Sequence, residues 1–387
     1  MIRGWAAAVW ASGALALWSA PAHAEPAMDV ALTYTGDVAA SVAGGSDESV
    51  RYLDNIDLTA TGDMDALVGW EGARFQLYVI GNFGRRPNDS AGTLEGVNNI
   101  EVGKQGLRLF EAWIEQDLGP STLRAGLYDL NSEFYANEAA GLLISPPFGI
   151  GSELATTGPN GPSIFPSSAL AVRLNVPVSD SGDYLRAAVL NARASTLGDD
   201  AGIDVSFDQG VLLIGEAGRE SEGLKLAAGG WAYSQKRDDI FHIDAVGEPL
   251  RQSAWGGYGL AEVRLLPRGE GGLDAFARAG FSHGHTTPFV WGGQAGLLLF
   301  PALESRPGSA ASIGVHYAQT SSAFEDSLRV AGVRPAGSEW AVEATYADKL
   351  APFLTVQPDV QLVFNPGGRA DAPVAVVTTL RVTVELP

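Results

Sequence analysis

The chain has 387 residues, with 48 glycines, 18% charged residues, no cysteine and a formal net charge of −20. The lack of cysteine excludes disulfide scaffolds, thiol catalysis and cysteine zinc sites. No apolar run after residue 24 approaches the roughly 20 residues of a spanning helix, 46% hydrophobic content excludes a disordered chain, and the acidic charge disfavours a nucleic-acid partner.

The first 24 residues have the organisation of a secretory signal peptide. Arg3 supplies a positive start, the segment 6–18 is apolar, and Ala22-His23-Ala24 forms a cleavage site of small residues. The apolar segment is too short for a membrane anchor. We therefore expect export, with a mature chain that begins at Glu25.

The mature sequence alternates apolar and polar residues with a period of two, which is typical of strands with one apolar face. The clearest runs cover residues 72–81, 170–176, 261–265, 275–279 and 380–386. Clusters rich in Gly, Pro, Asp, Asn and Ser separate the runs, as expected for antiparallel connections. About 20 to 25 residues per strand and connection would give on the order of 14 to 18 strands.

The polar faces of these strands carry arginines, which would cost roughly 2 to 4 kcal/mol each if they faced lipid at mid-depth. The pattern therefore favours a closed membrane barrel whose arginines face a wet interior, over a soluble β-sandwich with the same alternation. The arginines expected to face inward are Arg74, Arg124, Arg173, Arg264, Arg278 and Arg381. The carboxylates expected to oppose them are Glu111, Glu115, Glu262 and Glu343, and the aromatics expected near strand ends are Trp70, Phe83, Trp113, Tyr128 and Trp340.

Motifs for catalysis or metal binding are weak. His283 and His285 could share one face of a strand like half a metal site, but Thr286, Thr287 and Pro288 follow them, so we interpret the pair as part of a loop with no metal. The glycines at 149 and 151 do not open a dinucleotide-binding helix, and no nucleophile elbow with a plausible triad is visible. Catalysis is left without a candidate residue.

Four motifs in order resemble the carbohydrate-selective porins of the OprB family. They are the runs 95–101 (EGVNNIE) with 108–116 (RLFEAWIEQ), 123–134 (LRAGLYDLNSEF), 158–170 (GPNGPSIFPSSAL) and 354–368 (LTVQPDVQLVFNPGG). The resemblance extends from about residue 55 to the end. It implies an all-β fold, a single transmembrane antiparallel β-barrel of 16 strands over residues 25–387, with a constricted, water-filled lumen.

The resemblance also implies passive diffusion of monosaccharides and other small hydrophilic solutes, with no enzyme activity, cofactor or metal. Asn98, Asn99 and Glu101 are expected on a loop folded toward the channel. Motif position and strand phase together place these residues along the constriction and solute path: Arg74, Glu111, Arg124, Asp129, Asn131, Glu133, Arg173 and Arg264. The implied location is the outer membrane of a Gram-negative bacterium, and the implied partners are outer-membrane lipid, lipopolysaccharide, small sugars and the barrel-assembly machinery, with no nucleic acid.

Several alternatives stay open from sequence. An outer-membrane barrel enzyme would need a nucleophile beside a rim histidine such as His242 or His283, and a secreted sugar-binding β-sandwich would have no channel. The chain ends at Pro387 instead of the aromatic residue usual in outer-membrane barrels, although Leu386 holds the outward phase. An apolar outer surface fits either a monomer or a homotrimer.

Overall fold

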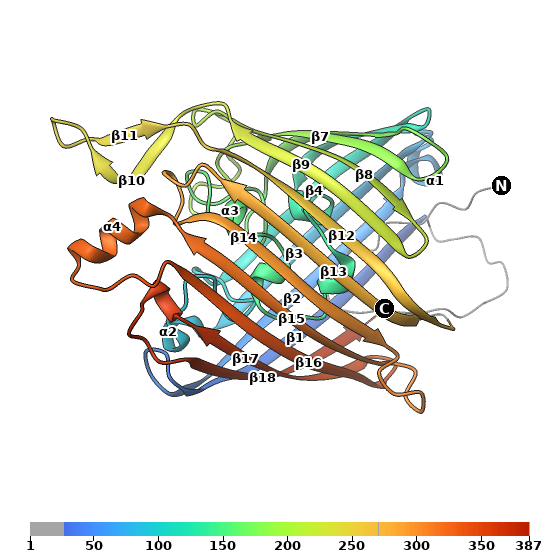
Figure 1. Cartoon of the computed structure of the whole chain (residues 1–387). Helices are drawn as coiled ribbons and strands as arrows, with labels where there is room; N and C mark the ends of the chain where they lie inside the picture. The colour runs from blue at the N-terminus through green and yellow to red at the C-terminus, as the bar shows by residue number, and fades with distance from the viewer. Residues whose placement is uncertain (1–26, 270, 387) are drawn as a thin grey trace.

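A computed structural model describes residues 27–269 and 271–386 and forms one closed antiparallel β-barrel (Figure 1). The expected leader, residues 1–24, lies outside the described residues. Sixteen strands make the barrel, as the family resemblance implied, and their order around the wall follows the chain. The first and last strands, β1 and β18, pair with each other and close the sheet, which excludes the two-sheet sandwich.

The wall strands are β1 (Met28–Ala43), β2 (Ser49–Asp63), β3 (Ala73–Gly84), β4 (Gly106–Leu118), β5 (Ser121–Tyr128), β6 (Ala169–Pro177), β7 (Asp183–Asn191), β8 (Val211–Ser221), β9 (Leu224–Tyr233), β12 (Trp255–Arg268), β13 (Gly271–Ser282), β14 (Phe289–Phe300), β15 (Ser309–Thr320), β16 (Ser338–Ala351), β17 (Leu354–Phe364) and β18 (Ala375–Leu386). A separate hairpin is formed by β10 (Arg237–Ile243) and β11 (Pro249–Gln252). The α-helices are α1 (Met64–Val68), α2 (Asn88–Ala91), α3 (Ser152–Ala155) and α4 (Ser322–Val330), and the 3₁₀ turns are η1 (Leu130–Ser132), η2 (Glu138–Ala140), η3 (Pro146–Phe148) and η4 (Pro366–Gly368).

Closure of the barrel is reinforced by an ion pair across the β1–β18 seam. Arg381 donates from Nε to Asp37 Oδ1 at 2.9 Å and from Nη2 to Asp37 Oδ2 at 2.8 Å. Both side chains are buried, so the pair is shielded from the screening that weakens surface ion pairs. The seam is therefore fixed by paired charges as well as by the backbone ladder.

The alternation predicted from sequence matches the two faces of the wall. On β6, Val172 and Leu174 are exposed to the outside, whereas Arg173 between them is buried. On β3, Leu77 is exposed and its neighbours Gln76 and Tyr78 are buried. The outer face is apolar and the polar residues point inward, which is the arrangement that a bilayer requires of a barrel.

The two ends of the barrel differ (Figure 1). At one end the strands are joined by short connections, such as residues 119–120 and 222–223, and there β1 begins and β18 ends. The other end carries the long loops, which we number L1 (44–48), L2 (85–105), L3 (129–168), L4 (192–210), L5 (234–254), L6 (283–288), L7 (321–337) and L8 (365–374). None of the helices in the described part of the chain is long and apolar enough to cross a membrane.

Two aromatic residues do not lie where the sequence pattern predicted. Tyr128 is buried and donates to Glu133, and Trp113 lies under the Arg124 guanidinium, so neither belongs to an outer aromatic band. Trp113 lies in the middle of β4, between the buried Glu111 and Glu115. Alternate residues of a strand face the same side, so Trp113 points inward with these two glutamates.

Candidate functional site

Loop L3 folds back into the barrel instead of projecting from it, and Figure 1 shows its short helix α3 within the barrel outline. Its apolar residues Leu130, Phe134 and Leu154 are fully buried in one cluster with inward-facing wall residues such as Trp231 and Tyr258. Burying a large apolar side chain is worth about 1.5 to 3 kcal/mol. The loop is therefore held against the β6–β12 side of the wall by its own small core.

Wall carboxylates hold the backbone of L3. Glu343 on β16 accepts from the N–H groups of Ile144 and Ser145, the latter at 2.9 Å. In the same way Glu216 on β8 accepts from Tyr135 N at 3.0 Å, and Glu262 on β12 accepts from Ala139 N at 3.1 Å. The sequence-based expectation that Glu262 and Glu343 oppose arginines is therefore wrong, because both satisfy loop N–H groups that would otherwise be buried without acceptors.

On β13 a wall side chain donates hydrogen bonds to L3 instead of accepting them. Arg278 is buried and donates to the carbonyls of Tyr135 at 2.9 Å, Gly149 at 3.0 Å and Pro147. Close approach of loop and wall also needs a glycine, since a Cβ at Gly314 on β15 would lie 2.6 Å from the Phe148 ring. Inward-facing residues of the wall thus both hydrogen-bond to L3 and leave space for its side chains.

Loop L2 lies inside the barrel against a different part of the wall. Glu339 on β16 accepts from Leu94 N and Glu95 N, each at 2.9 Å. Asn98 donates to Asp37 on β1 at 2.7 Å, and Asn99 accepts from Arg381 on β18 at 2.7 Å. The asparagines of this motif therefore contact the β1–β18 seam.

A group of charged residues lies where L3 meets β4 to β7, and we call it the arginine–glutamate cluster: Glu115, Arg124, Glu133, Arg173 and Arg186. Arg173 on β6 donates from Nε and Nη2 to the two oxygens of Glu133 on L3, at 2.8 and 2.9 Å, and also pairs with Glu115. Arg124 on β5 lies 3.0 Å from Glu115 and 3.4 Å from Glu133. Arg186 on β7 donates to the Glu133 carbonyl at 2.7 Å.

The members of the arginine–glutamate cluster differ in their accessibility. The Arg173 side chain is 2% exposed, whereas those of Arg124, Glu133 and Arg186 retain 12 to 14% exposure. Arg124 is also held flat by Trp113, whose ring centroid lies 3.8 Å from the guanidinium carbon. Solvent therefore reaches parts of Arg124, Glu133 and Arg186, whereas Arg173 at the centre of the cluster is shielded from it.

Electrostatics keep the cluster ionised. Burial alone would raise the pKa of Glu133, but the nearby Arg124, Arg186 and Arg173 favour the carboxylate and lower that pKa to about 2. Asp129, in the same loop, responds oppositely: burial and the neighbouring Glu111 raise its pKa. Paired charges of fixed state, rather than titrating groups, thus dominate around Glu133.

Three other predicted residues organise the start of L3. Glu111 is buried and accepts from Asp129 N at 3.0 Å and from Gln76. Asp129 caps η1 by accepting from Asn131 N at 2.9 Å, and Asn131 donates to the Gly149 carbonyl at 3.1 Å. These side chains position L3 beside the cluster.

The structure separates the two remaining candidates. Arg74 lies at the edge of the cluster and pairs with Glu115 at 2.7 Å while half of its side chain is exposed. Arg264 pairs with Asp274 near the short turn between β12 and β13, and none of its contacts is with the cluster. Sequence reasoning missed Arg186, although it alternates with Leu185 and Ala187 as the predicted inward arginines do with their neighbours.

Comparison with known proteins agrees with this architecture. Residues 47–386 match the sequence profile of the carbohydrate-selective porin, OprB family. The chain belongs to the OprB family. It is 22% identical to Porin B of Pseudomonas aeruginosa, over 92% of this chain and 87% of that protein. The high-pH structure of Pseudomonas putida OprB superposes with a TM-score of 0.82 at 22% identity, covering 93% of this chain and 94% of the other.

A more distant structure shares the barrel. The outer membrane channel DcaP of Acinetobacter baumannii has a TM-score of 0.57 at 10% identity, covering 93% of this chain and 97% of DcaP. Together with the closed barrel and its apolar outer face, membership of the OprB family identifies an outer-membrane porin for sugar diffusion, a channel rather than an enzyme.

Proposed function

We propose that monosaccharides cross this barrel by passive diffusion along the exposed edges of the arginine–glutamate cluster and of Arg74, beside the folded-in loop L3. The observation that carries the proposal is the Glu133–Arg173 ion pair, which joins L3 to the wall and leaves Arg124 and Glu133 partly exposed. Glu111, Asp129 and Asn131 support this path by fixing the start of L3.

The chemistry of the cluster suits a neutral polyhydroxylated solute. A sugar hydroxyl both donates and accepts hydrogen bonds, so it can donate to the Glu133 carboxylate and accept from the Arg124 guanidinium. Because the charged groups are already paired with one another, each contact with a sugar is weak, and weak binding lets a permeant leave again. The paired charges also hold their geometry while solutes pass.

The surroundings of the channel follow from the two different ends of the barrel. In outer-membrane barrels the short turns face the periplasm and the long loops lie at the outer end, so L1 to L8 would start from the outer mouth, with L2 and L3 folded back into the barrel. Residues 1–24 would be the leader removed on export, residues 25–387 the barrel domain, and the apolar band would contact lipid and lipopolysaccharide. Delivery would require the barrel-assembly machinery, and monomeric and trimeric forms are both compatible with the outer face.

Liposome swelling tests the proposal directly. Purified protein would be reconstituted and the swelling rates compared for glucose, a disaccharide and a neutral amino acid similar in size to glucose. We expect glucose to enter fastest. Equal entry of glucose and the amino acid would contradict a sugar preference and leave a general diffusion pore, and no swelling from a folded barrel would overturn the channel proposal.

A further inference from the structure

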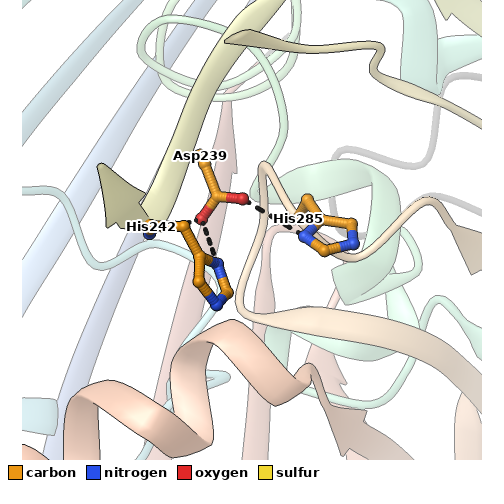
Figure 2. Close-up of side chains that lie close together, drawn as sticks. All are labelled: Asp239, His242 and His285. Carbon is orange, nitrogen blue, oxygen red and sulfur yellow. Dashed lines mark hydrogen bonds and ion pairs between the residues drawn. The ribbon is translucent and has the colours of Figure 1, made fainter. Parts of the chain in front are cut away.

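Two loops at the long-loop end bring together one carboxylate and two imidazoles outside the cluster that the channel uses (Figure 2). Asp239 and His242 lie on β10 of L5, and His285 lies on L6. His242 Nδ1 is 3.0 Å from Asp239 Oδ1, and His285 Nδ1 is 3.2 Å from Asp239 Oδ2. The candidate ligand atoms all lie within 4.8 Å of one another.

We propose that Asp239, His242 and His285 bind a divalent transition-metal ion such as Zn²⁺ at the outer mouth of the barrel. Two imidazole nitrogens and one carboxylate oxygen are a ligand set that such ions accept, with a fourth position left for water. At metal–ligand distances of about 2.0 to 2.2 Å, neighbouring ligand atoms lie about 3.3 Å apart. The two imidazole nitrogens lie 3.0 and 3.2 Å from Asp239, each from a different oxygen of its carboxylate, and both distances are close to that value.

The carboxylate is in place before any ion binds. The Asp239 side chain is fully buried, and its Oδ1 accepts from Phe241 N at 3.0 Å and from His242 N at 2.8 Å. The two imidazoles, in contrast, are 39% and 40% exposed, so an ion from the medium can reach them. Because the carboxylate is already fixed, only the two imidazoles would have to move when an ion binds.

Neighbouring groups extend the site. The His283 ring lies 5.2 Å from that of His285, centroid to centroid, and its Nδ1 is buried with no hydrogen-bond partner among the described residues. On α4 of L7, Asp326 Oδ2 lies 4.0 Å from His242 Nε2. A bound ion would therefore tie L5 to L6 and steady the contact with α4, which would clamp the projecting hairpin to its neighbouring loops.

The sequence alone could not assemble this site. The His283-Gly284-His285 motif offered half of a ligand set, and its partners lie more than 40 residues earlier on a hairpin outside the barrel wall. The structure places Ile240 N 3.0 Å from the His285 carbonyl, and this backbone hydrogen bond holds the two loops together. The ligand set is thus built by loop packing.

The test is calorimetric titration of ZnCl₂ into detergent-purified full-length protein made without a polyhistidine tag and stripped with EDTA. We expect one saturable ion per chain, and at least tenfold weaker binding for His242→Ala and for His285→Ala. Glu248→Gln, at the tip of the same hairpin, removes a carboxylate outside the site and should bind as the unaltered protein does. Heat-modifiable migration on gels would establish that each variant is folded.

Two further readouts separate a built site from adventitious binding. Co²⁺ should give visible absorption bands whose intensity falls in His242→Ala. Zn²⁺ should slow trypsin cleavage after Lys236, which directly precedes β10, and after Arg251 on β11. Absent saturable binding, or binding retained in the His242→Ala/His285→Ala double variant, would overturn the site. Binding without protection from trypsin would overturn the clamp.

Discussion

Glu133 and Arg173 are joined by two parallel hydrogen bonds, of 2.8 and 2.9 Å, although one residue lies on the folded-in loop L3 and the other on strand β6. Two-point pairing of a guanidinium with a carboxylate fixes orientation as well as distance. Arg173 is almost completely buried, so removing Glu133 would leave a charge without its main partner. The pair therefore determines where L3 lies beside the wall.

Arg124→Ala should widen the channel and reduce its sugar preference, because the Arg124 guanidinium is one of the exposed edges of the arginine–glutamate cluster. We expect single-channel conductance in planar bilayers to rise by roughly a factor of 1.5 to 2, since the shorter alanine side chain leaves a wider aqueous path beside L3. The glucose-to-amino-acid swelling ratio should fall toward one.

Arg264→Ala is the matched control for Arg124→Ala. It removes an inward-phase arginine of the same type, but one that pairs with Asp274 beside a short turn. Its conductance and swelling ratio should stay within error of the unaltered protein. Equal effects of the two substitutions would contradict the separation of Arg264 from the solute path.

Glu133→Gln should make the channel more anion-selective, because it removes one negative charge from a group that contains three arginines. We expect the chloride-to-potassium permeability ratio, taken from the reversal potential in a KCl gradient, to rise about twofold or more. Glu248→Gln, on the projecting hairpin, makes the same charge change away from the cluster and should leave the ratio unaltered.

The same variant has a defined pH dependence. Because the arginines lower the pKa of Glu133 to about 2, against a usual value of 4.5, the carboxylate stays ionised at pH 4. The stabilisation it gives to L3 is present above pH 4.5 and is lost only as the pH falls through about 2. The difference in selectivity between Glu133→Gln and the unaltered protein should therefore be as large at pH 4 as at pH 7; its disappearance at pH 4 would contradict the lowered pKa.

The wall of the barrel could be predicted from sequence because alternation is a local property. The order of residues is enough to predict which side chains of Val172, Arg173 and Leu174 face outward, since neighbouring side chains in a strand face opposite sides. The same alternation places Trp113 inward with Glu111 and Glu115, so the expectation that failed was that of an aromatic near a strand end, since Trp113 lies in the middle of β4.

The interior could be predicted only in part. The resemblance to the OprB family brought Arg124 and Glu133 into the expected site, and strand phase brought Arg173. Neither indicated that Glu216 and Glu343 bind loop backbone, because an inward glutamate has the same sequence pattern whether it meets water, an arginine or an N–H group. Such contacts depend on how L3 folds, and the sequence of L3 has no regular alternation of apolar and polar residues from which its fold could be predicted.

Glu343→Ala should loosen L3 and admit larger solutes. The substitution leaves the Ile144 and Ser145 N–H groups without their acceptor, at a cost of about 1 to 3 kcal/mol for each buried group. We expect the swelling rate for a disaccharide, relative to glucose, to rise at least twofold. Glu343→Gln keeps one carbonyl acceptor and should restore part of the discrimination, whereas an unchanged disaccharide rate in Glu343→Ala would show that this anchor does not hold the loop.

Val172→Arg should destabilise the barrel without touching its interior. Val172 lies in the middle of β6, 49% exposed on the outer face, between strands β5 and β7. An arginine facing lipid at mid-depth costs about 2 to 4 kcal/mol, so the urea midpoint for unfolding from lipid vesicles should fall correspondingly. Ile243→Arg is the control, because Ile243 is 62% exposed on the β10–β11 hairpin outside the barrel wall. Its free energy of unfolding should change by no more than about 0.5 kcal/mol. Equal destabilisation by the two substitutions would mean that Val172 does not face the lipid.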